Sequence, residues 1–240
     1  MMEYFKLMVE NRGITLKACA KRLKISVSTA FLWRHKILSA LWANHFEAMG
    51  GIVEADETTF LESEKGTRGI TYRKPRKRGG KAKKRCLSTE QVAVAVVVDR
   101  SGRAATMVAA KGQATAQQLD SLLHGLIDPD AKLCTDAAGN FEAYARRNGL
   151  EHYPLNASKG QRVPDIFHIQ HANSYQRQLK LWIERFYGVA TKYMNNYLYW
   201  FLMLDKHKKL EADKQNEQLL YASNLTPIPV PGQRFRPCMG

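Results

Sequence analysis

Two apolar segments separated by only three residues constrain the fold of this chain more than any other feature. Residues 91–99 (QVAVAVVVD) and 103–110 (RAATMVAA) have strand composition, and only RSG lies between them. So short a connection predicts an antiparallel hairpin. The other predicted elements are strands at residues 51–60, 131–138 and 151–156 and helices at residues 115–127, 140–149 and 167–187. The order predicts an α/β protein with a mixed sheet flanked by helices.

The chain divides into three zones by composition. Residues 1–48 have the pattern of short helices, residues 49–205 form the α/β body, and residues 206–240 are charged and then Pro-rich. We expect the last zone to be a weakly ordered tail. The 4 cysteines are far apart and form no C-x-x-C pair, which predicts reduced thiols and neither a zinc ribbon nor a disulfide framework.

Positive charge dominates the composition. The 240 residues carry 37 Lys and Arg against 22 Asp and Glu, a net charge of +15. Such an excess indicates a polyanionic partner, most often nucleic acid. The sequence shows no apolar run that could span a membrane and no signal peptide at its start.

Much of this charge lies in residues 65–85, a predicted loop between the first strand and the hairpin. The segment contains eleven Lys or Arg residues, no acid, four Gly and one Pro. Like charges at this density repel each other unless phosphates neutralise them, although a solvated loop without a partner is the alternative. The predicted DNA contacts are Arg73, Lys74, Arg76, Lys77, Arg78, Lys81, Lys83, Lys84 and Arg85.

The first zone contains two helical patterns joined by a short turn. Thr15 and Ser28 are the predicted N-caps of helices at residues 15–24 and 28–38. Such a pair fits a helix-turn-helix, although Lys24 stands where many turns have Gly, and an ordinary helical hairpin is the alternative. The residues available for DNA contact are Ser26, Ser28, Thr29, Arg34, His35 and Lys36.

Acidic residues interrupt the strand pattern of residues 51–60 (GIVEADETTF). Carboxylates are costly to bury unless a cation compensates them. Asp56 on this strand and Asp136 at the end of the fourth strand have the same setting, and two converging carboxylates suit Mg²⁺. Strand alternation places Glu54 on the face of Asp56, as a candidate to support the metal ligands, and Glu57 on the opposite face.

The long helix predicted at residues 167–187 offers candidates for a third ligand. Asn173 and Lys180 are seven residues apart and therefore share a helical face. Asn173 offers a carbonyl oxygen to a metal, and Lys180 offers a charge to a nearby phosphate. Gln176 and Glu184 lie on nearly the same side and compete for the ligand role.

The order Asp56, Asp136, Asn173 and Lys180 resembles the D-D-E transposases, and more closely the bacterial ISXO-type insertion-sequence family with its D-D-N-K pattern. The matching stretches are VEADET, CTDAAGNFEAY, ISVSTAFLWRHKIL and residues 171–201. Two departures from the family are notable: no N-terminal zinc ribbon precedes the helix-turn-helix, and Gln176 stands where relatives often have His.

This resemblance implies a ribonuclease H-like core that cuts and joins DNA at transposon ends. Asp56, Asp136 and Asn173 would be ligands of two Mg²⁺ ions, with Mn²⁺ as the alternative, and Lys180 would contact DNA. The expected partners are terminal inverted repeats, target DNA and further copies of the chain. The implied location is the bacterial cytoplasm, in association with the nucleoid.

Three functional hypotheses follow from the sequence. The first is a Mg²⁺-dependent DNA transposase, which would be a truncated copy if the family's zinc ribbon has been lost. The second is a catalytically inactive DNA-binding protein derived from a transposase. The third is a ribonuclease H-like nuclease or resolvase, against which the helix-turn-helix pattern counts.

Overall fold

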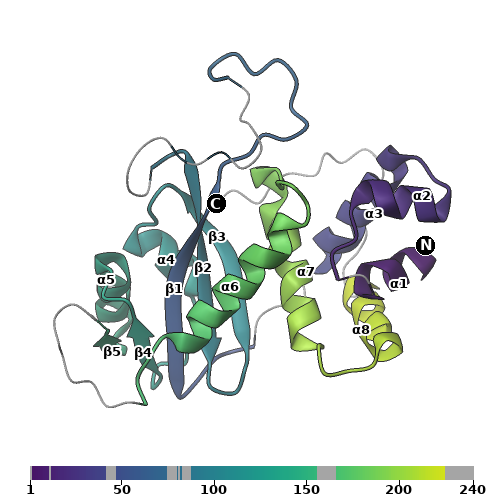
Figure 1. Ribbon diagram of the computed structural model, residues 1–240. Helices are drawn as coiled ribbons and strands as arrows, with labels where there is room; N and C mark the ends of the chain where they lie inside the picture. Colours follow the sequence, from purple (N-terminus) through teal and green to yellow (C-terminus); the bar gives the residue numbers. More distant parts are fainter. Residues whose placement is uncertain are drawn as a thin grey trace. The chain divides into compact units, whose positions relative to one another are not determined.

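The structure is a computed structural model of the whole chain (Figure 1). It describes residues 2–10, 12–41, 47–74, 80, 82, 88–155 and 166–224. These residues form two compact units, one from Phe46–Lys180 and one from Met1–His45 together with Leu181–Gly240. In the part of the chain that the structure describes, no helix is long and apolar enough to cross a membrane.

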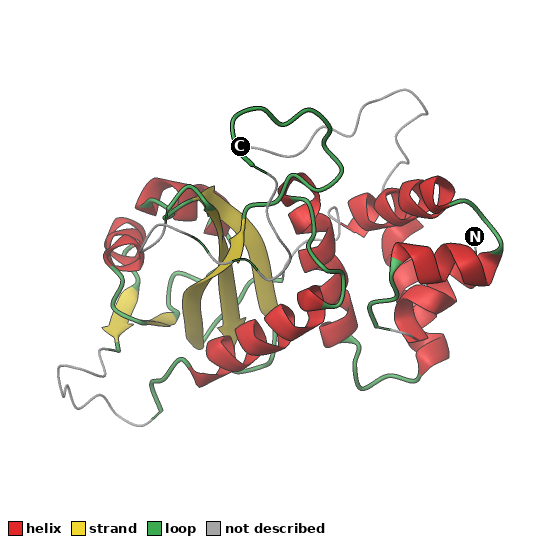
Figure 2. Ribbon diagram, turned by 45° about the horizontal axis from the view of Figure 1, so that its top comes forward, coloured by secondary structure: helices red, strands yellow, loops and turns green. Residues whose placement is uncertain are grey.

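The Phe46–Lys180 unit is built on a five-stranded sheet, drawn in yellow in Figure 2. The strands are β1 (Ile52–Leu61), β2 (Gln91–Asp99), β3 (Ala104–Lys111), β4 (Lys132–Thr135) and β5 (Glu151–Pro154), in the order β3-β2-β1-β4-β5. β1, β2 and β3 are antiparallel neighbours, whereas β4 pairs in parallel with both β1 and β5. This is the predicted mixed sheet, and it has the ribonuclease H-like strand order.

The predicted hairpin is confirmed, and its turn has a clear local cause. Asp99 and Arg103 close the turn through a backbone hydrogen bond of 3.0 Å, and Gly102 adopts a φ of 87° that glycine tolerates best. The Asp99 carboxylate accepts hydrogen bonds from the backbone N–H groups of Ser101 and Arg103, both at 2.9 Å. β2 is buried from Val92 to Asp99, in agreement with its continuous apolar run.

Helices of this unit pack around the sheet (Figure 1). α4 (Ala116–Leu123) begins at Thr115 with a capping box and packs against α5 (Gly139–Asn148). α6 (Gln170–Glu184) contacts Glu54 and Asp56 on one face of β1 and belongs to this unit as far as Lys180. The two faces of β1 therefore have different neighbours, since Glu57, the next residue along the strand, interacts with Asn140 of α5.

The second unit is helical. It contains α1 (Met2–Glu10), α2 (Leu16–Leu23), α3 (Val27–Ala40), α7 (Met194–Lys206), α8 (Ala212–Asn224) and a 3-10 turn at Thr191–Tyr193. Its core is aromatic: Trp200 is fully buried, Trp182 meets it edge-on at 5.1 Å between ring centroids, and the Arg34 guanidinium lies 5.1 Å above the Trp200 ring.

The grouping of the segments in the structure differs from the predicted zones in two places. Residues 181–205 cluster with the N-terminal helices instead of with the sheet. Residues 206–240 are not uniformly a weakly ordered tail, because α8 packs against α1 and α3 and buries Leu219 and Ala222. Charged residues before and within α8 make its few apolar positions hard to recognise in the sequence. Residues 225–240 lie outside the described residues.

The two helices of the predicted helix-turn-helix are present, with one corrected cap. The Thr15 side chain accepts a hydrogen bond from the Ala18 N–H, as predicted for an N-cap. α3 is capped by Ser26 and not by Ser28, since the Ser26 Oγ accepts from the Thr29 N–H at 2.9 Å. Lys24 adopts the left-handed conformation that glycine usually supplies at this turn, with a φ of 54°.

Candidate active site

The pairing of β1 with β4 sets Asp56 and Asp136 beside each other. Glu54 pairs with Cys134 in the parallel register, and each aspartate lies two residues further along its own strand direction. Neighbouring strands lie about 4.8 Å apart, and residues two apart return to the same face. Asp56 and Asp136, the two carboxylates predicted from the sequence to bind a metal, are therefore expected side by side on one face of the sheet.

Asp56 is held by neighbours from its own strand and from α6. Its Oδ1 accepts from the backbone N–H of Glu57 at 2.7 Å, and its Oδ2 accepts from the Gln176 Nε2 at 2.9 Å. Burial raises the pKa of the Asp56 carboxyl, and the negative charge of Asp136 raises it further. The positive charge of Lys180 acts in the opposite direction, so both Asp136 and Lys180 lie within electrostatic reach of Asp56.

Asp136 is exposed and lies on a strained turn. Its Oδ1 accepts from the Ala138 N–H at 3.1 Å. The next residue, Ala137, has a φ of 65°, in the left-handed region that costs a non-glycine residue about 1–2 kcal/mol. Backbone strain of this kind persists where the surrounding structure fixes the chain, here immediately after a site carboxylate.

α6 brings Gln176 to the aspartates. Among the described residues, its side chain is the one from this helix that hydrogen-bonds Asp56, and it is buried. Asn173 lies on an exposed part of α6, where its role as a metal ligand stays a prediction. Of the two competitors named from the sequence, Gln176 faces the site, whereas Glu184 belongs to the other unit of the chain.

Glu57, which strand alternation predicts on the opposite face from Asp56, interacts with α5. Burial raises the pKa of its carboxyl, and a hydrogen bond with Asn140 opposes this rise. Its Oε1 is buried without a hydrogen-bond partner among the described residues. Glu57 therefore contacts α5 through Asn140, while the negative charges of Asp56 and Asp136 also raise the pKa of its carboxyl.

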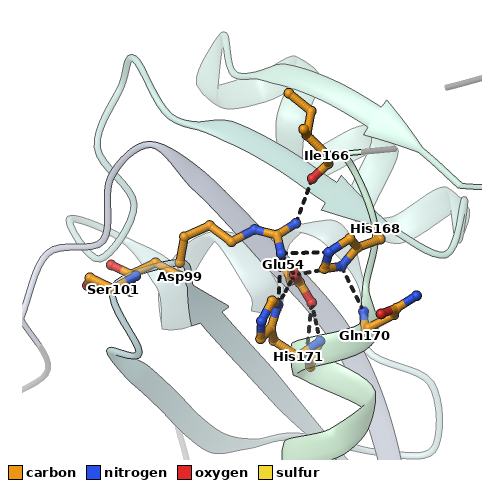
Figure 3. A network of polar contacts seen from close by, with 9 residues as sticks. Glu54, Asp99, Ser101, Ile166, His168, Gln170 and His171 are labelled. Carbon is orange, nitrogen blue, oxygen red and sulfur yellow. Dashed lines mark hydrogen bonds and ion pairs between the residues drawn. The ribbon is translucent and has the colours of Figure 1, made fainter. Parts of the chain in front are cut away.

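Glu54 anchors the start of α6 to β1 (Figure 3). Its Oε2 accepts from the backbone N–H groups of His171 and Ala172 at 2.7 and 3.0 Å. Its Oε1 lies 2.7 Å from the His171 Nδ1, 3.2 Å from the His168 Nδ1 and 3.1 Å from the Arg100 Nη1. Sequence reasoning missed these three partners, although the i, i+3 spacing of His168 and His171 before a long helix was a detectable signal.

The same cluster has the ligand types of a metal site, since Glu54, His168 and His171 offer atoms within 4.8 Å of one another. Arg100, from the hairpin turn after β2, has its Nη1 2.8 Å from the His168 Nε2 and 2.9 Å from the His171 Nδ1. The guanidinium thus occupies the centre of the cluster and supplies the positive charge that the buried carboxylate requires.

The residues predicted to contact DNA from α3 fall into two groups. Arg34 and His35 are 0% and 2% exposed, so their prediction as DNA contacts was wrong. The Arg34 Nη2 donates to the Ile14 carbonyl at 2.8 Å, and the His35 ring stacks beside Phe31 and Tyr193. The remaining candidates keep some exposure and stay predictions: Ser26, Ser28, Thr29 and Lys36.

Of the DNA contacts predicted in the basic segment, Arg73 and Lys74 are described. Arg73 donates to the Glu64 carboxylate at 3.1 Å and lies 3.9 Å from that of Glu62, which also pairs with Lys111 at 2.7 Å. Lys74 is exposed. The other predicted contacts, which are Arg76, Lys77, Arg78, Lys81, Lys83, Lys84 and Arg85, lie outside the described residues.

The strand order and the paired aspartates facing one helix define a ribonuclease H-like protein. Residues 48–202 match the ISXO2-like transposase domain, and the chain belongs to this family of transposases. No curated protein matches the chain.

Solved structures similar to this chain include two complexes of the Mos1 transposase. A pre-cleavage Mos1 transpososome has 15% sequence identity and a TM-score of 0.31, with 98% of this chain and 79% of that chain covered. The Mos1 strand transfer complex has 15% identity and a TM-score of 0.29, with 93% and 76% covered.

Proposed function

We propose that this transposase cleaves DNA at the ends of an insertion sequence and joins them to target DNA in a reaction that depends on Mg²⁺. The observation that supports this most directly is that Asp56 on β1 and Asp136, directly after the adjacent parallel strand β4, lie near the helix that carries Gln176 and Lys180. Such an arrangement concentrates negative charge where hard oxygen ligands meet.

The residues present fit a divalent cation. Asp56 is half-buried, and its neighbours within the described residues supply one amide, one backbone N–H and the more distant charge of Lys180. A cation would compensate the carboxylate that burial disfavours. Asp56 and Asp136 would hold it, with Asn173 as the predicted third ligand. When bound, Mg²⁺ supplies Lewis-acid activation of an attacking oxygen and stabilises the leaving oxygen.

The chain's own residues have separable roles in this proposal. Gln176 orients the Asp56 carboxylate through its amide, which leaves the other lone pairs of that carboxylate directed at the ligand. Lys180, exposed on the same helix, provides a positive charge for a phosphate of the DNA near the aspartates. Positive charge in residues 65–85 holds the DNA backbone, so binding weakens steeply as salt rises.

The test is strand cleavage of a labelled transposon-end duplex in Mg²⁺. We expect the parent chain to cleave, Asp136→Ala to lose cleavage while it still binds the duplex, and EDTA to abolish the reaction. Asp130→Ala is the matched control, because it removes another exposed acid next to the opposite end of β4. Salt-sensitive binding without cleavage by the parent chain would instead establish the inactive DNA-binding protein.

A further inference from the structure

Glu54 is the most thoroughly buried carboxylate near the site, and the reaction proposed above gives it no chemical role. It is 0% exposed, yet it makes five polar contacts with groups from the hairpin turn and from the start of α6. A buried charge with this many partners is a strong structural constraint.

We propose that Glu54 is a positioning residue, which fixes the register of α6 along β1 so that Gln176 faces Asp56. This inference rests on the proposed function, because its consequence is the rate of DNA cleavage. Glu54 reaches neither the DNA nor the proposed ion in this account. It acts through the helix that it holds.

The spacing of the contacts supports a two-point attachment. Glu54 and Asp56 are two residues apart on β1, which corresponds to about 6.6 Å. Their partners on α6, Ala172 and Gln176, are four residues apart, which corresponds to about 6 Å of helical rise. The distance between the two contacts is therefore nearly the same along the strand and along the helix. Lys180 lies one further turn along the same face of α6.

The geometry also selects one register against its neighbours. A shift of α6 by one residue moves the helix about 1.5 Å along its axis and turns it by about 100°. Such a shift would remove the first-turn N–H groups of α6 from Glu54 and turn Gln176 away from Asp56 at the same time. Glu54 binds these N–H groups where the helix dipole favours a negative charge, so the attachment is specific to the helix start.

Arg100 completes the attachment from a third segment. Its Nη1 lies 3.1 Å from the Glu54 Oε1, and its Nη2 donates to the Ile166 carbonyl at 2.8 Å, four residues before α6 begins. The guanidinium therefore compensates the buried carboxylate and holds the chain that leads into the helix. Glu54 contacts the first turn of α6, and Arg100 contacts the segment before it. Both attachments therefore lie N-terminal to Gln176, the residue that bonds Asp56.

The experiment compares Glu54→Gln with the parent chain in single-turnover cleavage and in DNA binding. The Gln amide keeps the size of the side chain but has one acceptor oxygen and no charge, so its N–H₂ group must face either the N–H donors of α6 or the Arg100 guanidinium, and either arrangement weakens the attachment. We expect cleavage to slow by about 100-fold, the scale of a misplacement of about 1 Å, with the Kd for DNA unchanged.

Asp99→Asn is the matched control for loss of a buried carboxylate. Asp99 is 2% exposed in the same sheet, accepts from two backbone N–H groups and pairs with Arg103 at 2.6 Å, but its contacts stay within its own hairpin turn. We expect it to destabilise the unit and leave the cleavage rate within about threefold of the parent. If Glu54→Gln does not fold, Glu54→Asp shortens the same attachment and replaces it in the comparison.

A double-mutant cycle with Gln176→Ala separates positioning from general destabilisation. If Glu54 acts through Gln176, Glu54→Gln slows cleavage strongly in the parent chain and by less than threefold in the Gln176→Ala background. Full additivity, or equal effects of Glu54→Gln and Asp99→Asn on the rate, would overturn the inference. A parent chain that does not cleave at all would refute the proposed function instead, before this comparison begins.

Discussion

His35 provides a quantitative test of the helical unit. Its ring is 2% exposed, lies tilted against the Tyr193 ring with 4.1 Å between centroids, and accepts a hydrogen bond from the Asn196 Nδ2 at its Nδ1, 3.0 Å away. An Nδ1 that accepts a hydrogen bond carries no proton, so the folded state holds the neutral ring. Burial lowers the pKa of His35 to about 4, and the positive charges of Arg34 and Lys192 add to this effect.

The sign of the linkage follows from that direction. The unfolded chain takes up a proton near the ordinary pKa of 6.5, whereas the folded chain does so only near 4. The contribution of the neutral ring to stability is therefore complete above pH 6.5 and is lost as the pH falls toward 4. Integrated over this window the loss amounts to about 3 kcal/mol, of which about 2 kcal/mol has been lost by pH 5.

Tryptophan fluorescence measures this unit, because the tryptophans among the described residues, Trp33, Trp182 and Trp200, all belong to it. Urea unfolding should show the free energy of unfolding fall by about 2 kcal/mol between pH 7 and pH 5, a shift of the midpoint by roughly 1 M. His35→Asn keeps an acceptor for Asn196 but cannot take up a proton. We expect this variant to be less stable at pH 7 and to lose most of the pH dependence.

The control is His124→Asn, an exposed histidine at the end of α4 in the other unit, which should unfold with the pH dependence of the parent chain. A His35→Asn variant whose stability falls between pH 7 and pH 5 as steeply as that of the parent would refute the reasoning. It would show that His35 is protonated inside the folded unit or that the unit does not depend on its neutrality.

Three further predictions concern the site. Ala137→Gly should raise the free energy of unfolding by about 1 kcal/mol, because Ala137 has a φ of 65° that glycine adopts without strain. Ala138→Gly, at a φ of −67°, should lower it. Hydrogen exchange of the β2 amides measures both changes. Mg²⁺ at about 100 times its Kd should stabilise the parent chain by about 2.7 kcal/mol in thermal unfolding, and Asp56→Asn should abolish this gain while Asp130→Asn keeps it. Gln176→Glu places a third carboxylate beside Asp56 and Asp136. It should therefore destabilise the fold in EDTA and increase the stabilisation by Mg²⁺ in the same thermal unfolding assay. Gln178→Glu, on an exposed part of the same helix, should have neither effect.

Much of the site was predictable because its signals are local. An acid in an apolar strand pattern is costly unless something compensates it, which singled out Asp56 and Asp136 before any contact was known. Helical spacing predicted Asn173 and Lys180 on one face, with Gln176 and Glu184 as competitors on nearly the same side. The DNA contacts from α3 were less predictable, since Arg34 and His35 have the residue types of a DNA-binding surface but are buried by α7 and its preceding turn, more than 150 residues away in sequence.

The sequence by itself determined the elements of this protein. The hairpin, the strand pattern, the caps of α2 and α4 and the family membership all follow from short-range patterns of apolar spacing, turn residues and motifs. Tertiary structure alone decided which segments meet: that α8 joins α1, that Arg100 and two histidines surround Glu54, and that Gln176 is the α6 residue at Asp56. These contacts join residues up to about 120 positions apart in the sheet unit, and their energy comes from burial and charge compensation that no local pattern encodes.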